Sequence, residues 1–344
     1  MEIIAGWTHT AFPIDDASRV GEARRHAAHL AREIGLGEVE AGRLALVVTE
    51  LGSNLQRHAK AGQLLIASRP DRGDVEVISI DEGPGITDMA RCMSDGYSTG
   101  NGSSPGTGLG AVRRLADEFD IHSSIPTDTV PGGTLCVARV RRLDAPAIAL
   151  APGVVEVGAV NVAAPGEVAH GDAWALALDG EQASLMVADG LGHGPEAAKA
   201  SQAASGEFRA QPFGAMAGLL DAIHVALQTT RGAAVCCLRL DGQTVRCAGA
   251  GNVVARIVSG VFDRSMVTQH GTLGLQMRRA QEAVMALPPY AMVIVLSDGI
   301  ETRWDPSRIR PLMDRDPALV AALLLREHSR KRDDATVVVL RRVH

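Results

Sequence analysis

Aromatic residues are scarce in this chain: Phe, Trp and Tyr make up 3% of its 344 residues. Proteins that bind single-stranded nucleic acid stack bases on aromatic side chains, and duplex binding needs an excess of positive charge. This chain has few aromatic rings and a formal net charge of -6. We therefore expect no nucleic-acid partner.

Cysteine is also sparse. The five cysteines are odd in number and show no Cys-x-x-Cys spacing, which argues against a disulfide framework and against a zinc site. Most of them fall in apolar, strand-like segments, so we expect reduced core thiols and a cytoplasmic protein.

No uninterrupted apolar run is long enough for a membrane helix. The most apolar stretch, residues 145–164, is interrupted by Pro146, Pro152 and Glu156. The N-terminal sequence Met-Glu-Ile-Ile-Ala-Gly lacks the basic and apolar regions of a signal peptide. We expect neither membrane insertion nor a membrane partner.

Hydrophobic residues make up 46% of the chain, enough for a core in each of two domains, which is the number that 344 residues favour. Residues 143–153 contain two prolines and few polar groups, as in a short semi-rigid linker. We therefore predict an N-terminal domain at 1–142, a linker at 143–153 and a C-terminal domain at 154–344.

Apolar residues recur at helical spacing over 18–34 and again over 38–60. The second predicted helix also places Glu50, Asn54 and His58 four residues apart, so these side chains share one face. Taken alone, such a row is typical of a solvated helix face.

A strand predicted at 75–80 leads into Asp81-Glu-Gly-Pro-Gly85, and a glycine-rich loop at 94–110 leads into a helix predicted at 111–119. Glycine lets backbone N–H groups approach an anion, and a helix N-terminus favours negative charge. The segment Gly106-Thr-Gly-Leu-Gly110 therefore suits a nucleotide's phosphates, although the chain lacks a P-loop motif.

In combination, Glu50-x-x-x-Asn54, Asp81-x-Gly83-x-Gly85, Gly106-Thr-Gly-Leu-Gly110 and Gly133-Thr134 resemble the GHKL (Bergerat) ATP-binding fold, an α/β sandwich. More narrowly, residues 1–142 are similar to the anti-sigma-factor serine kinases of the RsbT type. The resemblance implies ATP with Mg²⁺ as cofactor, Asn54 as Mg²⁺ ligand and Glu50 as the base that accepts the substrate hydroxyl proton. It also implies a base and phosphate site formed by Asp81, Gly83, Gly85, Thr107, Gly108, Leu109, Gly110 and Thr134.

Acidic residues stand at strand boundaries in the second half of the sequence. Asp189 and Asp298 each follow an apolar strand, Asp172 opens another, and Asp333-Asp334 opens the last. Hard cations such as Mg²⁺ and Mn²⁺ prefer carboxylate oxygen. The four positions together predict a divalent metal site.

The ordered motifs of this half, Gly171-Asp172, Asp189-Gly-Leu-Gly-His-Gly194, Gly251-Asn252, Ser297-Asp298-Gly299 and Asp333-Asp334-Ala-Thr336, resemble the metal-dependent (PPM) serine/threonine phosphatases. The similarity is to the SpoIIE group and, in length, to its RsbX-like members, which implies an αββα sandwich. It also implies two Mn²⁺ or Mg²⁺ ions bound by Asp172, Asp189, the Gly190 carbonyl, Asp298 and Asp333. Whether Asp333 or Asp334 is the ligand stays open. It also stays open whether His193 protonates the leaving oxygen or is only a helix cap or a surface residue.

The sequence thus predicts a two-domain protein of the α+β or α/β class. Its predicted function is a bifunctional partner-switching regulator, in which Glu50 serves a kinase and Asp189 and Asp298 serve a phosphatase. The implied substrates are STAS-domain phosphoproteins of a sigma-factor or stressosome-type pathway. The alternative is a phosphatase regulated by a nucleotide-gated binding module that has no kinase activity. Whether the chain self-associates is left open.

Overall fold

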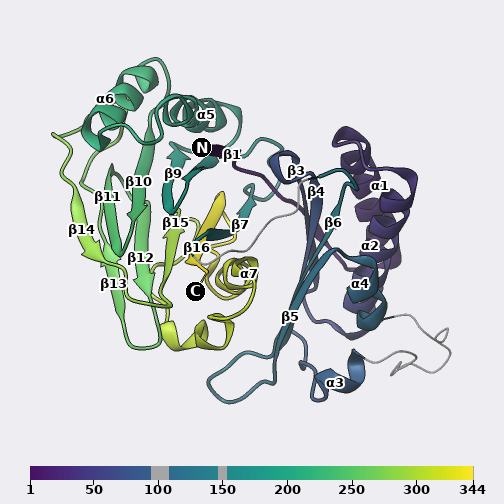
Figure 1. Ribbon diagram of the computed structural model, residues 1–344. Helices are drawn as coiled ribbons and strands as arrows, with labels where there is room; N and C mark the ends of the chain where they lie inside the picture. Colours follow the sequence, from purple (N-terminus) through teal and green to yellow (C-terminus); the bar gives the residue numbers. More distant parts are fainter. Residues whose placement is uncertain (94–107, 146–152, 344) are drawn as a thin grey trace. The chain divides into compact units, whose positions relative to one another are not determined.

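The computed structural model describes residues 1–93, 108–145 and 153–343, which form two compact units of mixed helix and sheet (Figure 1). The N-terminal unit comprises residues 9–148, and the C-terminal unit comprises residues 1–8 and 149–344. Among the described residues, no helix is both long and apolar enough to cross a bilayer.

The N-terminal unit is built on an antiparallel sheet with the strand order β2-β3-β4-β6-β5. Its strands are β2 (Thr10–Pro13), β3 (Gln63–Arg69), β4 (Asp74–Ile80), β5 (Glu118–Ser124) and β6 (Gly133–Arg141), and its helices are α1 (Ala17–Glu33), α2 (Glu38–His58), α3 (Met89–Cys92) and α4 (Leu109–Leu115). Helices α1, α2 and α4 share a buried apolar cluster with β3, β4 and β6. This arrangement is the α/β sandwich that the sequence predicts.

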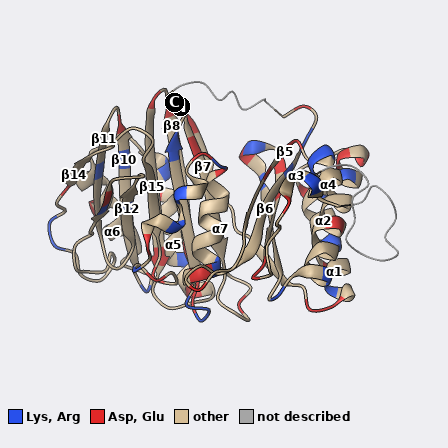
Figure 2. Cartoon of the chain, turned by 90° about the horizontal axis from the view of Figure 1, so that it is seen from below, with Lys and Arg blue, Asp and Glu red and all other residues tan. Residues whose placement is uncertain are grey.

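Local signals explain where α1 begins and which faces α1 and α2 bury. Asp16 caps α1 by accepting a hydrogen bond from the backbone N–H of Ser18 at 2.6 Å. The apolar residues at helical spacing, such as Leu30 in α1 and Leu44 in α2, are buried in the core. The rest of both helices carries charges of both signs (Figure 2).

The helix predicted at 111–119 is too long. Helix α4 ends at Leu115, and residues 118–124 form the edge strand β5, which pairs with β6. The apolar residues Val112, Leu115 and Phe119 suit a helical period, but Phe119 reaches the same apolar cluster from the strand. Sheet pairing therefore overrides the local helical pattern.

Two antiparallel sheets form the C-terminal unit, with the strand orders β1-β8-β9-β10-β11-β14 and β13-β12-β15-β16-β7. The first contains β1 (Glu2–Ala5), β8 (Asp172–Asp179), β9 (Gln182–Gly190), β10 (Ala233–Asp241), β11 (Thr244–Ala250) and β14 (Ala283–Ala286). The second contains β7 (Val155–Val162), β12 (Val254–Val258), β13 (Asp263–Met266), β15 (Met292–Leu296) and β16 (Ala335–Arg342).

Helices cover the outer faces of these two sheets. Helices α5 (Pro195–Ala210) and α6 (Met216–Leu227) pack on the first sheet, and α7 (Pro317–His328) packs on β7 and β16 of the second (Figure 1). The layers are thus helix, sheet, sheet and helix, as the predicted αββα sandwich requires.

Residues 1–8 do not lie in the domain to which the sequence analysis assigned them. Strand β1 pairs antiparallel with β8, with Glu2 opposite Leu178 and Ala5 opposite Ala175. The Trp7 ring lies edge-on to Trp174 with 4.6 Å between centroids, and both rings are buried. Residues 1–8 therefore belong to the C-terminal unit and not to the N-terminal one. Strand β8 of the C-terminal unit gives them backbone hydrogen-bond partners, and Trp174 gives them apolar contact.

Two further details correct or confirm sequence expectations. Strand β9 continues through Asp189 to Gly190, so Asp189 lies inside the strand and not after it. Four of the five cysteines, Cys136, Cys236, Cys237 and Cys247, are buried, which confirms the expected core positions.

We predict that Gly158→Ala destabilises the protein by about 1–3 kcal/mol, the usual cost of overpacking. A Cβ on Gly158 in β7 would stand 2.0 Å from the backbone nitrogen of Ala318 in α7, so the helix would have to shift. Thermal unfolding measures the change. Gly206→Ala, in an open position of α5, is the control and should stabilise by roughly 0.5–1 kcal/mol; equal effects of the two variants would contradict the packing account.

Two candidate active sites

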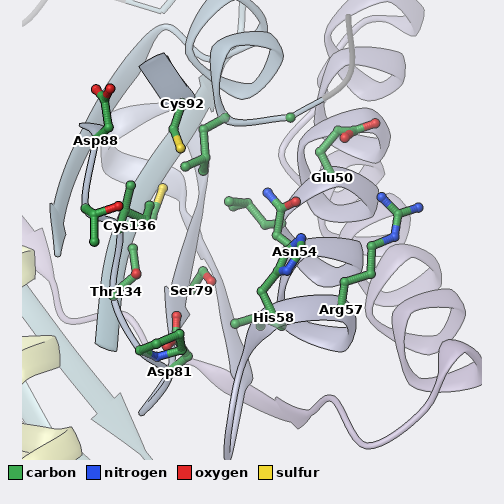
Figure 3. A pocket seen from close by; sticks show the side chains of 18 of the residues that line it. Glu50, Asn54, Arg57, His58, Ser79, Asp81, Asp88, Cys92, Thr134 and Cys136 are labelled. Atoms are coloured by element: carbon green, nitrogen blue, oxygen red, sulfur yellow. The ribbon is translucent and has the colours of Figure 1, made fainter. Parts of the chain in front are cut away.

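A pocket of about 370 Å³ lies in the N-terminal unit between α2 and the sheet (Figure 3). Its lining residues are Glu50, Leu51, Asn54, Leu55, Arg57, His58, Ser79, Asp81, Pro84, Gly85, Ile86, Thr87, Asp88, Arg91, Cys92, Gly108, Leu109, Thr134 and Cys136. Most of the predicted nucleotide residues are therefore in one place, and the volume suits a small-molecule cofactor.

Helix α2 supplies one wall. The face that carries Glu50, Asn54 and His58 is turned to the pocket, so the predicted polar row is not simply a solvated stripe (Figure 3). Burial raises the pKa of Glu50 above its ordinary value, while the positive charge of Arg57 opposes that rise. A carboxylate with a raised pKa is the better proton acceptor at neutral pH.

The end of β4 supplies the opposite wall. Asp81 donates its backbone N–H to the Thr134 carbonyl at 3.1 Å, and its Oδ1 accepts the Gly83 N–H at 2.6 Å. Gly85 has a φ of +73°, and a Cβ there would lie 2.2 Å from the Ser124 carbonyl oxygen. The Asp-x-Gly-x-Gly turn therefore fixes the Asp81 carboxylate and requires glycine at position 85.

The hydroxyl of Ser123, which lies beside the predicted Thr134 behind this turn, was not predicted. Ser123 Oγ accepts the Ile86 N–H at 2.8 Å and lies 3.1 Å from Thr134 Oγ1. Ser79, which also lines the pocket, stands two residues before Asp81 and so lies on the same side of β4. That spacing was a usable signal for Ser79, whereas Ser123 lies in β5, a strand that was not predicted.

The predicted phosphate segment is only partly described. Gly108, with a φ of +142°, and Leu109 line the pocket, and Gly110 is buried in the first turn of α4. Thr107, together with the loop at 94–106, lies outside the described residues.

The second site lies in the C-terminal unit, where Asp172 and Asp189 face each other across the β8–β9 ladder. Burial raises the pKa of Asp172 to about 7 and, with the negative charges of the neighbouring aspartates, that of Asp189 to about 9. Burial and Asp333 likewise raise the pKa of Asp298. The structure therefore brings the predicted carboxylates close enough to repel one another.

The last strand's two acids differ in what surrounds them. Asp334 is buried, and its two carboxylate oxygens accept the N–H groups of Ala164 at 2.8 Å and Gly171 at 3.0 Å. Asp333 is only partly buried, and its Oδ1 accepts the N–H of Asp334 at 3.0 Å. Asp334 thus braces two loops, which leaves Asp333 the better candidate ligand.

The donor chemistry fits a hard divalent cation, because the site consists of carboxylate oxygens whose charges oppose one another. Across residues 1–93, 108–145 and 153–343, however, no three His, Cys, Asp or Glu side chains are arranged to hold an ion as they stand. An ion would have to draw these carboxylates together. Gly190 directly follows Asp189 in the chain. A Cβ on Gly190 would lie 2.1 Å from the Ala197 carbonyl oxygen, so only glycine fits at this position.

Two polar neighbours complete the surroundings. Asn252 donates to Asp298 Oδ2 at 2.6 Å, and the exposed His193 ring lies 2.7 Å from Glu167 Oε1 through Nδ1. The helix start does not use His193 as a side-chain cap. The Asn252 contact was signalled only by its place in an ordered motif, and the Glu167 contact had no sequence signal.

Comparisons with known proteins agree with the division of the chain into two units, each with its own site. The histidine kinase-like ATPase domain family matches residues 12–136, and the family of stage II sporulation protein E (SpoIIE) matches residues 179–343. The serine/threonine-protein kinase RsbT of Bacillus subtilis (strain 168) is 40% identical over 103 residues, which are 29% of this chain and 76% of RsbT.

Solved structures are also similar to this chain. One, from a study of the bacterial stressosome as a modular system adapted to control secondary messenger signaling, is 27% identical, with a TM-score of 0.52 over 55% of this chain and 100% of its own. A crystal structure of RsbX in complex with magnesium is 18% identical, with a TM-score of 0.49 over 55% of this chain and 95% of its own.

The RsbT match spans most of that kinase at high identity, and the second family match lies wholly in the C-terminal unit. Through its N-terminal unit the chain therefore belongs to the RsbT-type serine/threonine-protein kinases, and it joins that unit to a SpoIIE-type phosphatase domain of the PPM class.

Proposed function

We propose that the chain is a partner-switching regulator that phosphorylates serine or threonine on STAS-domain proteins with ATP and removes the same phosphate with its second unit. The observation that carries the proposal is the pairing of two sites in one chain. One is a nucleotide-sized pocket that contains a partly buried carboxylate, and the other is a cluster of crowded carboxylates. The relatives named for RsbT and the stressosome support this class of partner.

In the proposed kinase reaction, Asp81 accepts a hydrogen bond from the adenine amino group, and Asn54 holds Mg²⁺ at the phosphates. Glu50 stands on the same helix face as Asn54, one turn earlier, where it can take the proton of the attacking hydroxyl (Figure 3). The raised pKa of Glu50 suits that role. Phosphoryl transfer needs chiefly such positioning and charge stabilisation.

In the proposed phosphatase reaction, Asp172, Asp189, the Gly190 carbonyl, Asp298 and Asp333 would hold the Mn²⁺ or Mg²⁺ ions. When bound, such a metal pair supplies a water of lowered pKa and a clamp for phosphate oxygens. Asn252 orients Asp298, and Asp334 fixes the backbone at Ala164 and Gly171.

A second candidate function is a phosphatase whose N-terminal unit binds ATP and a partner without transferring phosphate. The exposure of Arg57 and His58 at the pocket edge favours it, because a basic rim can hold a partner's acidic side chains. Transfer of labelled phosphate from ATP to a STAS protein, with the phosphatase silenced by Asp298→Asn, distinguishes the two. Label on serine or threonine supports the kinase, and ATP binding without label supports the binding module.

We predict that Glu50→Gln retains ATP binding but slows phosphate transfer by about 100-fold, because it removes only the base. Asn54→Ala should instead lose Mg²⁺-dependent ATP binding, because it removes a metal ligand. Equilibrium binding of a fluorescent ATP analogue and single-turnover transfer separate the two effects. If both variants lose binding equally, the two roles are misassigned.

We predict that Asp189→Asn lowers Mn²⁺-dependent release of phosphate by at least about tenfold, because a neutral side chain weakens metal activation of water. ATP binding should be unchanged. The matched control is Asp179→Asn, an exposed acid at the far end of β8, which should keep wild-type activity. Wild-type turnover by Asp189→Asn at saturating Mn²⁺ would exclude this aspartate as a ligand.

A further inference from the structure

A buried chain of polar groups connects the start of the protein to Asp172. Asn161 in β7 and Thr336 in β16 are cross-strand neighbours and are almost fully buried, at 2% and 0% exposure. Asn161 Nδ2 donates to the Trp7 carbonyl at 3.3 Å, and Thr336 Oγ1 lies 2.8 Å from Asp172 Oδ2. The two residues thus lie between the N-terminal segment and a predicted metal ligand.

The direction of these hydrogen bonds follows from the chemistry of the groups. Because the Trp7 oxygen can only accept, the Asn161 amide must turn its nitrogen toward Trp7 and its Oδ1 toward Thr336, 2.9 Å away. The Thr336 hydroxyl has a single hydrogen and two acceptors in reach, Asn161 Oδ1 and Asp172 Oδ2. The amide and the carboxylate therefore compete for one hydrogen.

Residues 6 and 7, where this series of hydrogen bonds begins, are packed closely against Trp174. The Trp7 carbonyl also accepts from Trp174 Nε1 at 3.3 Å, and Gly6 donates to the Trp174 carbonyl at 2.9 Å. A Cβ on Gly6 would lie 2.1 Å from that carbonyl oxygen, so the backbone approach requires glycine. The position of residues 6–8 thereby fixes how the Asn161 amide faces Thr336.

The same segment continues directly into the nucleotide-binding unit. Thr8 is followed by His9, whose buried ring lies 3.1 Å from Glu76 Oε1 in β4. Strand β4 ends at Ile80, next to Asp81 of the pocket. Residues 7 and 8 are therefore anchored in the phosphatase unit, and the peptide bond after Thr8 links them to His9, whose ring contacts β4 of the ATP-binding unit.

We propose that Asn161 and Thr336 are positioning residues that relay the placement of the N-terminal segment to the Asp172 carboxylate. The inference rests on the phosphatase function proposed above. When Thr336 donates to Asp172, it orients that carboxylate toward a cation; when Asn161 holds the hydrogen, Asp172 loses this support. Residues 1–8 would then regulate metal binding although they contact no metal.

A double-mutant cycle tests the relay through Mn²⁺ affinity, measured by the electron paramagnetic resonance signal of free Mn²⁺ in titrations of the full chain. Thr336→Val should lower the affinity by about tenfold or more, as loss of an outer-shell partner does. Thr336→Ser should restore it. Asn161→Leu removes the competing acceptor and should tighten binding, but only while Thr336 is present.

Controls separate the relay from a general loss of structure. Ser184→Ala removes a hydroxyl of similar burial in β9, which donates to the Pro212 carbonyl at 2.6 Å, and should leave Mn²⁺ affinity unchanged. Thermal unfolding without metal should show that every variant is folded. If Asn161→Leu has the same effect with and without Thr336, or none in either background, the relay is wrong.

Hydrogen exchange tests the other end of the relay. Mn²⁺ should change the exchange rates of the amides in residues 2–8 of the wild type, and this response should disappear in Asn161→Leu. Exchange that is insensitive to Mn²⁺ in the wild type would contradict the proposal. A wild type that binds Mn²⁺ with the predicted cycle but releases no phosphate would contradict the proposed phosphatase function and leave the relay supported.

Discussion

Repulsion among buried and partly buried carboxylates is the constraint on which the C-terminal unit depends. Asp172, Asp189 and Asp298 come from three strands or strand ends, and burial and mutual charge raise the pKa of each. Groups that repel one another stay together only where the surrounding structure holds them. The two packed sheets do so, because Asp172 and Asp189 are locked in register and Thr336 binds Asp172 from the second sheet.

Acids in the N-terminal unit are stabilised in a different way. Burial alone would raise the pKa of Glu76, but Arg139 and Arg69 hold it well below its ordinary value, through contacts of 2.7 and 3.3 Å. That group is neutralised within the sheet and needs no ion. Glu76 is thus paired with arginines inside the sheet, whereas the aspartates of the second site have like charges as neighbours. This contrast supports our proposal that the aspartates serve the chemistry and Glu76 serves the fold.

Much of this could be predicted from the sequence because the patterns are local. The row of Glu50 and Asn54 on α2 could be predicted from helical spacing, and the acids of the second site could be predicted from aspartates at or near the boundaries of apolar strands. What could not be predicted depends on long-range pairing. Strand β1 joins β8 across more than half of the chain, and β5 becomes a strand only because β6 lies beside it.

The choice between Asp333 and Asp334 shows the same limit. The two residues are identical in type and adjacent in sequence, so no spacing rule separates them. The N–H groups of Ala164 and Gly171, both distant in sequence, donate to the two oxygens of Asp334, which is why we propose Asp333 as the ligand. Only folding brings those donors to the site.

Steady-state production of ADP with a STAS protein as the shared substrate tests most directly whether one chain runs both reactions. With ATP, Mg²⁺ and Mn²⁺, the wild type should produce ADP continuously, because each phosphate added is removed again. Asp298→Asn should stop after one phosphate per acceptor site, because the product accumulates. Continuous ADP production by Asp298→Asn at the wild-type rate would contradict the account.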